Sequence, residues 1–361
     1  MHSLTADYLT KLRFDTQQSA TLRALGEYRG KQRLYVAQSP EVLSDLRQVA
    51  IVESTESSNR LEGVVVAAGR IKSLVLKNAS PKSRSEQEVA GYRDALGLIH
   101  DSAVHMPFAE GTVLQLHGIL YRYMPQPGGR WKATNNDIVE RHPDGSSRIR
   151  FRPVAAHLTP IAIADLVGRY AQALDRHLAD PLVLVPLVIL DFLCVHPFPD
   201  GNGRMARLLT LQLLYHFDYA VGRYISLERI FEESKESYYE TLEASSQGCH
   251  QAAHDSAPWI DYFWGALLRA YKEFEERVGT IERARGSKGD RVRTEIAKRT
   301  VPFSISEIEQ ACPGVSRDMI RLILRTMKAE GSIAPTGKGR GARWEKIEPT
   351  STKGASRKRR K

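Results

Sequence analysis

The segment PLVLVPLVILDFLCV at 181–195 is the longest apolar stretch in the chain, and it constrains the fold more than any other feature. It is shorter than the roughly 20 residues needed to span a bilayer, and it contains Asp191 and two prolines. We therefore expect a helix buried in a protein core rather than in a membrane. A length of 361 residues leaves room for two domains.

Helical periodicity dominates most of the remaining sequence and predicts a mainly α-helical protein. Segments with this periodicity include 85–104, 110–123, 159–178, 204–217, 234–246 and 256–285. The pattern breaks at 125–154, which is rich in turn residues. There Pro143-Asp144-Gly145 lies between β-prone pieces at 138–139 and 149–151, so we expect a short β-hairpin.

The C-terminal part of the sequence predicts a separate small domain. The polar segment RARGSKGDR at 283–291 is the expected linker. Within 292–347, a short helix, a turn capped by Ser316, a second helix and a glycine-rich stretch predict a winged helix-turn-helix. Its basic residues are spaced along the second helix and the wing: Arg317, Arg321, Arg325, Lys338, Arg340 and Arg343. They suit either DNA phosphates or a face for dimerisation or target recognition.

The formal charge of +10 is concentrated at the C-terminus, because the tail at 348–361 contains six basic residues near its end. We expect this tail to be a solvated, disordered end, with a phosphate-seeking arm as the alternative. The three cysteines form no CxxC pair, which fits a reducing compartment. The N-terminus lacks the apolar core of a secretory signal. We therefore expect a cytoplasmic protein with no membrane association.

The segment HPFPDGNGRMAR at 196–207 follows the apolar stretch directly and has the residues of a phosphate-handling site. The glycines flanking Asn202 permit a tight turn into a helix whose free N–H groups attract anions. Arg204 and Arg207 lie one helical turn apart and suit phosphate oxygens. Asp200 is a hard oxygen ligand for Mg²⁺, and His196 can accept a proton near neutral pH. A proline stop, a glycine turn and two exposed arginines are the plainer alternative.

This segment resembles the signature of the Fic family, HxFx(D/E)GNGRxxR, at every defined position. The resemblance extends over roughly 30–275 and implies a Fic-fold helical bundle, with the hairpin as a target-docking flap. It implies a protein adenylyltransferase that moves AMP from Mg-ATP to a Ser, Thr or Tyr hydroxyl of a target protein or of itself. The expected boundaries are an N-terminal helical region at 1–105 and a catalytic core at 106–282.

Under this resemblance the site residues have specific roles. His196 would deprotonate the hydroxyl and Asp200 would hold Mg²⁺. The expected nucleotide-binding residues are Gly201, Asn202 and Gly203 at the α- and β-phosphates, Arg204 at the triphosphate and Arg207 at the γ-phosphate, with Met205 and Ala206 between them. Tyr239 is a candidate for the adenine pocket, although packing against the core is the alternative.

The segment SSNRLEG at 57–63 resembles the family's inhibitory motif, (S/T)xxxE(G/N), in the class that carries it before the catalytic core. The resemblance makes Ser58, Glu62 and Gly63 the inhibitory residues, with Glu62 pairing to Arg207 and excluding the γ-phosphate. A helix that merely ends at a glycine would have the same pattern. Whether such inhibition acts within one chain or across a homodimer is open.

Two other patterns do not survive inspection. His250 and His254 have the spacing of zinc ligands, but Gln251 replaces the glutamate of HExxH. Gly331 and Gly337-Lys338 have the wrong spacing for a phosphate-binding loop, and Gly339 follows where Ser or Thr is needed. Two alternatives to AMP transfer remain. The first is phosphate transfer, which the resemblance disfavours because the kinase-like members of the family depart from GNG at the second glycine, intact here as Gly203. The second is a DNA-binding regulator that senses ATP.

Overall fold

The computed structural model describes residues 2–38, 40–141, 146–299, 301–337 and 343–347. It divides into two compact units, Met1–Glu276 and Arg277–Lys361. The predicted hairpin turn at 143–145, the wing residues Lys338 and Arg340, and the tail at 348–361 lie outside the described residues.

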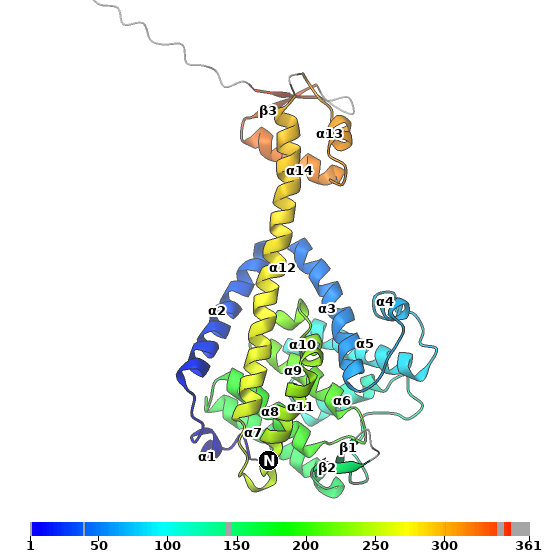
Figure 1. Cartoon of the computed structure of the whole chain (residues 1–361), viewed down its shortest axis with the longest axis vertical. Helices are drawn as coiled ribbons and strands as arrows, with labels where there is room; N and C mark the ends of the chain where they lie inside the picture. Colours follow the sequence, from blue (N-terminus) through cyan, green and yellow to red (C-terminus); the bar gives the residue numbers. More distant parts are fainter. Residues whose placement is uncertain (1, 39, 142–145, 300, 338–342, 348–361) are drawn as a thin grey trace, which may run out of the picture. The chain divides into compact units, whose positions relative to one another are not determined.

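The first unit is a bundle of helices with one β-hairpin (Figure 1). Its longer helices are α2 (Thr16–Gln38), α3 (Pro40–Leu61), α4 (Ala68–Leu76), α5 (Arg84–Ser102), α6 (Glu110–Leu120), α7 (Thr159–Asp175), α8 (Pro181–Val195), α9 (Asn202–His216), α11 (Lys235–Ser246) and the first part of α12 (Ala257–Ala297), which continues into the second unit. The shorter ones are α1 (Ala6–Leu9) and α10 (Leu227–Glu233). The hairpin pairs β1 (Ile138–Arg141) antiparallel with β2 (Ser147–Phe151), as predicted. The expected mainly α-helical fold is therefore confirmed.

The apolar segment forms α8, which is buried along almost its whole length, as the sequence predicts. Asp180 caps its start by accepting a hydrogen bond from the Leu182 N–H at 2.8 Å. Pro186 lies inside the helix and cannot donate to the Leu182 carbonyl one turn earlier. The indole N–H of Trp264 on α12 donates to that carbonyl at 2.7 Å instead. A tertiary contact thus replaces the bond that the proline removes.

The helix α12 corrects the expected linker. It continues through 283–291, where the sequence predicted a break, and the two units divide at Glu276/Arg277 instead. The segment contains no proline, and each glycine in a helix costs only about 1 kcal/mol relative to alanine. Two glycines among good helix formers are therefore insufficient to end the helix.

The second unit has the predicted order of elements. It contains α13 (Ile305–Ala311), α14 (Arg317–Ala329), β3 (Ile333–Thr336) and β4 (Arg343–Lys346), with β3 and β4 antiparallel. Ser316 caps α14 by accepting from the Met319 N–H, as expected. The core of this unit is a single apolar cluster that includes Val292, Ile296, Phe303, Ile320 and Leu324. No helix of the described part of the chain is long and apolar enough to cross a membrane.

The described residues of the two rejected patterns have other contacts or roles in the fold. His250 stacks on Phe151, and His254 stacks on Tyr8 with its Nε2 2.8 Å from the Ser3 hydroxyl. The described residues contain no group of three His, Cys, Asp or Glu side chains that could hold a metal ion by themselves. Gly331 ends α14 with a φ of 73°, and a strand rather than a helix follows it.

Candidate active site

His196 stands directly after α8 in the left-handed region, with φ 49° and ψ 61°. A residue other than glycine in this conformation costs about 1–2 kcal/mol and persists only where its surroundings fix it. Its backbone N–H donates to the Phe192 carbonyl at 2.9 Å, which completes the last turn of the helix. The chain then turns sharply, and the imidazole lines a cavity of about 360 Å³.

The loop after His196 is closed by its own side chains. Phe198 is fully buried, and its ring stacks on that of His117 with 3.7 Å between centroids and a 1° interplanar angle. The Asn202 side chain accepts from the Phe198 N–H at 2.9 Å and donates to the Phe198 carbonyl at 2.8 Å. This amide is therefore occupied in shaping the loop. The Asn202 backbone N–H lies in the first turn of α9, among the groups that have no intrahelical acceptor.

The N-terminus of α9 faces the cavity. Gly201 precedes the helix with a φ of 78°, and Gly201, Asn202 and Gly203 all line the cavity. The first N–H groups of a helix have no intrahelical acceptor, and the helix dipole adds positive potential there. This end of α9 is thus a site for an anionic group, as the sequence predicted for its glycine-containing turn.

Arg207 lies one turn into α9, and its side chain is only 2% exposed. Its Nε donates to the Ser58 hydroxyl at 2.8 Å, and its Nη2 donates to the Ser58 carbonyl at 2.9 Å and to Glu62 Oε1 at 2.6 Å. Burial opposes the charge, but the Glu62 carboxylate outweighs it and raises the pKa of the guanidinium. Nη1 is buried with no hydrogen-bond partner among the described residues. Arg207 therefore retains an unused donor.

The Glu62 carboxylate lies against the first turn of α9. A Cβ placed on Gly203 would stand 2.2 Å from Glu62 Oε1, so only glycine leaves room for this contact. Glu62 follows the end of α3, and Gly63 has the left-handed φ of 78° that terminates the helix. The glycine thus follows the end of the helix, and Glu62 lines the cavity at this point.

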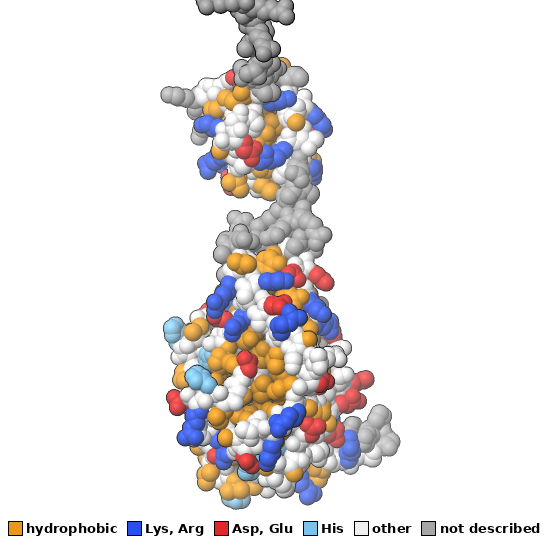
Figure 2. Space-filling view, turned by 90° about the vertical axis from the view of Figure 1, so that its left-hand side faces the viewer, with side chains coloured by type: hydrophobic (Ala, Val, Ile, Leu, Met, Phe, Trp, Pro, Cys, Tyr) orange, Lys and Arg blue, Asp and Glu red, His pale blue; other side chains and the backbone are white. Residues whose placement is uncertain are grey.

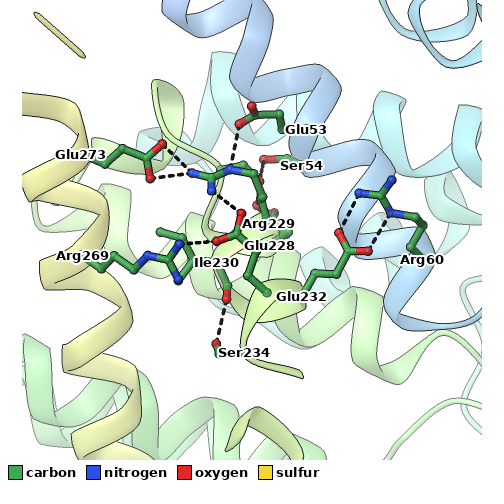
Figure 3. Close-up of polar contacts among 12 residues, drawn as sticks. Glu53, Ser54, Arg60, Glu228, Arg229, Ile230, Glu232, Ser234, Arg269 and Glu273 are labelled. Atoms are coloured by element: carbon green, nitrogen blue, oxygen red, sulfur yellow. Dashed lines mark hydrogen bonds and ion pairs between the residues drawn. The ribbon is translucent and has the colours of Figure 1, made fainter. Parts of the chain in front are cut away.

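The C-terminal half of α3 is fixed by ion pairs to α10, and α10 is paired in turn to α12 (Figure 3). Arg60 makes a two-bond contact with Glu232 at 2.6 and 2.9 Å. Arg229 contacts Glu273 at 2.7 and 2.6 Å and Glu53 at 3.2 Å. These contacts tie the helix that carries Ser58 and Glu62 to the body of the first unit.

Arg204 does not reach the cavity. Its side chain is 2% exposed, and Nη1 donates to Glu88 at 2.7 Å while Nη2 lies 3.7 Å from Asp200. Met205 and Ala206 are also buried and do not line the cavity. These three positions depart from the nucleotide-binding set expected from the sequence, because a helix turns 100° per residue and carries Gly203 and Arg207 to the cavity face but not the residues between them.

Asp200 is the only carboxylate of the 196–207 segment, and its side chain is 66% exposed. Partial burial raises its pKa, but hydrogen bonding from Tyr121 and the charge of Arg204 outweigh it, so the net shift is downward. An ionised, exposed carboxylate at the cavity wall fits a Mg²⁺ ligand. Asp200 is the residue of this segment that would hold such an ion.

The imidazole of His196 is kept neutral. Burial and, after it, the charge of Lys132 lower its pKa, Glu62 and Asp200 oppose the shift, and the net result is a pKa of about 4. Its Nδ1 is buried and has no hydrogen-bond partner in the described part of the chain. A neutral imidazole at neutral pH is the form that can accept a proton.

The remaining walls of the cavity come from the hairpin and α11. Ile138, Arg150 and Phe151 lie on the hairpin side, and Tyr238 and Tyr239 on the other. The Tyr239 hydroxyl donates to the Leu61 carbonyl at 3.3 Å. Tyr239 therefore lies at the cavity wall, where an aromatic ring could pack on a base, while the more deeply buried Tyr238 has the core-packing role.

Four residues important to this geometry were not singled out from the sequence: Glu88, His117, Lys132 and Asn136. His117 donates from Nε2 to the Asp200 carbonyl at 3.1 Å and accepts from the Gly129 N–H at 2.9 Å. Each of the four contacts the 196–207 segment from a distant part of the sequence. No local spacing marks such residues.

Residues 107–214 match the protein family described as the Fic/DOC family. Among solved structures, a Fic family protein from Desulfovibrio desulfuricans G20 is 21% identical, covers 94% of this chain and 98% of its own, and gives a TM-score of 0.60. A Fic-domain-containing signalling protein from Bacteroides thetaiotaomicron is 21% identical over 71% of this chain and 98% of its own, with a TM-score of 0.58. A fragment of Fic-1 from C. elegans is 19% identical over 73% of this chain and 72% of its own, also at 0.58. The chain therefore carries a Fic/DOC family domain, and its fold is that of the Fic proteins.

Proposed function

We propose that this protein transfers AMP from Mg-ATP to a hydroxyl side chain of a target protein or of itself, and that Glu62 holds the reaction in check. The observation that carries the proposal is the joint placement of His196, Asp200 and the N-terminus of α9 around one cavity. Membership of the 107–214 domain in a family of typical transferases supports it. A cytoplasmic location, expected from three free cysteines, would supply the ATP.

The residues present fit the phosphates of the nucleotide. The first turn of α9 offers backbone N–H groups, Gly203 leaves a space that a side chain would fill, and the Nη1 of Arg207 is an unused buried donor. Asp200 is the residue that would hold Mg²⁺, which supplies positive charge to the phosphate oxygens.

In the proposed reaction, His196 accepts the proton of the target hydroxyl while that oxygen forms a bond to the α-phosphorus. The bond from the α-phosphorus to the bridging oxygen breaks, and pyrophosphate leaves with its electron pair. The neutral state of the imidazole makes it competent for this step. The α9 N-terminus stabilises the charge that develops on the phosphate oxygens.

Glu62 opposes this reaction by occupying the place of a phosphate. Its single carboxylate neutralises Arg207 and lies against the first turn of α9, where the nucleotide would bind. A nucleotide must therefore displace a charge-assisted hydrogen bond before the triphosphate can reach Arg207. Inhibition by a residue of the same chain needs no dimer, although a homodimer is compatible with it.

The position of the label in ATP tests the proposal. The Glu62→Gly protein is incubated with ATP radiolabelled on either the α- or the γ-phosphorus, and protein-bound label is counted. AMP transfer predicts α-label only, with little in the unaltered protein and at least about 100-fold less than in the parent when the double variant also carries His196→Ala. Protein-bound γ-label would instead establish phosphate transfer, and absence of both labels would refute a transferase.

A second function, binding of duplex DNA, is favoured by the charge distribution. Residues 277–361 contain 22 Lys and Arg against nine Asp and Glu, a formal charge of +13 in a chain whose total is +10. Lys and Arg side chains are spread over the visible face of the second unit (Figure 2). On α14, Arg317 and Arg321 pair with Glu309 and Asp318 at the surface, and such pairs are weak enough to exchange for phosphates.

Fluorescence anisotropy with a labelled random-sequence duplex tests this second function. The full chain should bind with an affinity that falls steeply with salt, and replacing Arg321 and Arg325 together with Glu should weaken it. Lys77→Glu together with Lys272→Glu, a matched change of two exposed basic residues on the first unit, should leave it unchanged. Salt-insensitive binding, or none, would favour a protein-directed role for this unit.

A further inference from the structure

The backbone around His196 is held by hydrogen bonds to its flanking carbonyls. These are the carbonyls of Val195, Pro197 and Phe198, and the donors on 132–136 are remote in sequence. The left-handed conformation of His196 depends on such external contacts, because the local chain disfavours it. The donors therefore bear on the direction of the imidazole.

Lys132 is the first of these donors. It is only 4% exposed, and its Nζ donates to the Val195 carbonyl at 3.0 Å and to Asn136 Oδ1 at 2.8 Å. Its backbone N–H also donates to the Pro197 carbonyl at 2.8 Å. Lys132 thus binds the carbonyl groups of both residues next to His196, Val195 before it and Pro197 after it.

Asn136 continues the same contact. It receives the Lys132 ammonium on its oxygen and donates from Nδ2 to the Phe198 carbonyl at 2.9 Å. The two oxygens that Lys132 Nζ contacts are uncharged, so this ammonium is buried without the compensation of a carboxylate at those positions. Burial accordingly lowers the pKa of Lys132 to about 8. Burial of the Lys132 ammonium costs free energy of folding, so fold stability alone poorly explains why a lysine lies here.

The segment also joins His196 to the hairpin. Asn136 lies two residues before β1, and Asn136, Asp137 and Ile138 line the cavity together with His196. The short segment 132–136 therefore links two parts of the site through its hydrogen bonds. One is the hairpin wall, against which an acceptor protein would lie, and the other is the loop that carries the base. The contacts of Lys132 and Asn136 set the separation between them.

We propose that Lys132 and Asn136 are positioning residues that fix the left-handed backbone of His196 and thereby aim its imidazole at the acceptor hydroxyl. The inference rests on the proposed function, in which His196 is the base. Neither residue touches the reacting atoms, so their loss should affect the rate of transfer rather than the binding of ATP. Misplacement of a reacting group by about 1 Å can reduce a rate on the order of 100-fold.

The kinetic test uses the Glu62→Gly protein as the parent. Adding Lys132→Met or Asn136→Ala should lower kcat by about 10- to 100-fold while leaving KM for ATP unchanged. Adding Lys132→Arg should restore part of the rate, because it returns a cation and its donors. Arg130→Met is the matched control: it removes a positive charge from an exposed side chain two residues away and should leave kcat unaltered.

A spectroscopic measurement tests the same inference without AMP transfer. In protein labelled with carbon-13 at histidine Cε1, the His196 resonance is assigned by its absence from His196→Ala. Lys132→Met and Asn136→Ala should shift or broaden it, and Arg130→Met should not. An unchanged resonance, an unchanged kcat, or a loss of ATP binding equal to the loss of kcat would overturn the inference. A parent without transfer activity would refute the proposed function and leave the spectroscopic test intact.

Discussion

Replacement of Glu62 offers the sharpest test of the proposed inhibition, and the structure sets the size of its effect. Glu62 Oε1 accepts from Arg207 at 2.6 Å, and the arginine side chain is 2% exposed. A hydrogen bond between charged groups contributes about 1.5–3 kcal/mol net. A nucleotide that must displace it binds about 10- to 100-fold more weakly, since each 1.4 kcal/mol is a factor of ten. Glu62→Gly should therefore tighten ATP binding by about this factor.

Isothermal titration calorimetry with Mg-ATP measures the change directly. Glu62→Gln should fall between the unaltered protein and Glu62→Gly, because the amide keeps the bulk and a neutral acceptor but loses the charge. Glu86→Gln is the control, since Glu86 pairs with Arg70 at 2.8 Å and does not line the cavity. Equal dissociation constants for the unaltered protein and Glu62→Gly would refute the reasoning.

Three further predictions follow from separate contacts. Gly203→Ala should lower the melting temperature, because its methyl group would lie 2.2 Å from Glu62 Oε1. It should not release transfer activity, because the methyl group would also fill the space for a phosphate. Activity equal to that of Glu62→Gly would contradict this. Trp264→Phe should lower the free energy of unfolding by about 1–3 kcal/mol, measured by urea denaturation, because it leaves the Leu182 carbonyl without this donor; an unchanged value would count against it. Burial lowers the pKa of His100 to about 3, below its unfolded value, so stability is lost as pH falls below about 6.5; His100→Gln should reduce the loss between pH 7 and pH 5 by about 2 kcal/mol, and equal losses in both proteins would contradict the assignment.

Much of the fold was predictable because the signals are local. The apolar segment at 181–195 and the turn residues between 139 and 149 mark a buried helix and a hairpin, and both are found. The order of elements in the second unit follows from alternating helical and turn patterns. The linker at 283–291 was wrong because polar composition and two glycines are weak evidence against a helix when no proline is present.

In the candidate site, too, the residues marked by local sequence could be predicted, and those that depend on tertiary contacts could not. The residues of 196–207 are contiguous, so their chemistry could be inferred together, and the pairing of Glu62 with Arg207 was expected from the resemblance. The direction of each side chain was not available from the segment alone, and Arg204 turned out to contact Glu88 instead of the cavity. Lys132 and Asn136 escaped notice because their role depends on tertiary contacts across about 60 residues.

The central claim is that His196 acts as a base in a site that binds ATP through other groups. The most direct measurement compares Glu62→Gly with the double variant that also carries His196→Ala, determining both the dissociation constant for Mg-ATP and the rate of AMP transfer. We predict an unchanged dissociation constant and a rate lower by about 100- to 10,000-fold, the usual contribution of general base catalysis. Transfer at the parent rate by the double variant, or loss of ATP binding along with transfer, would contradict the account.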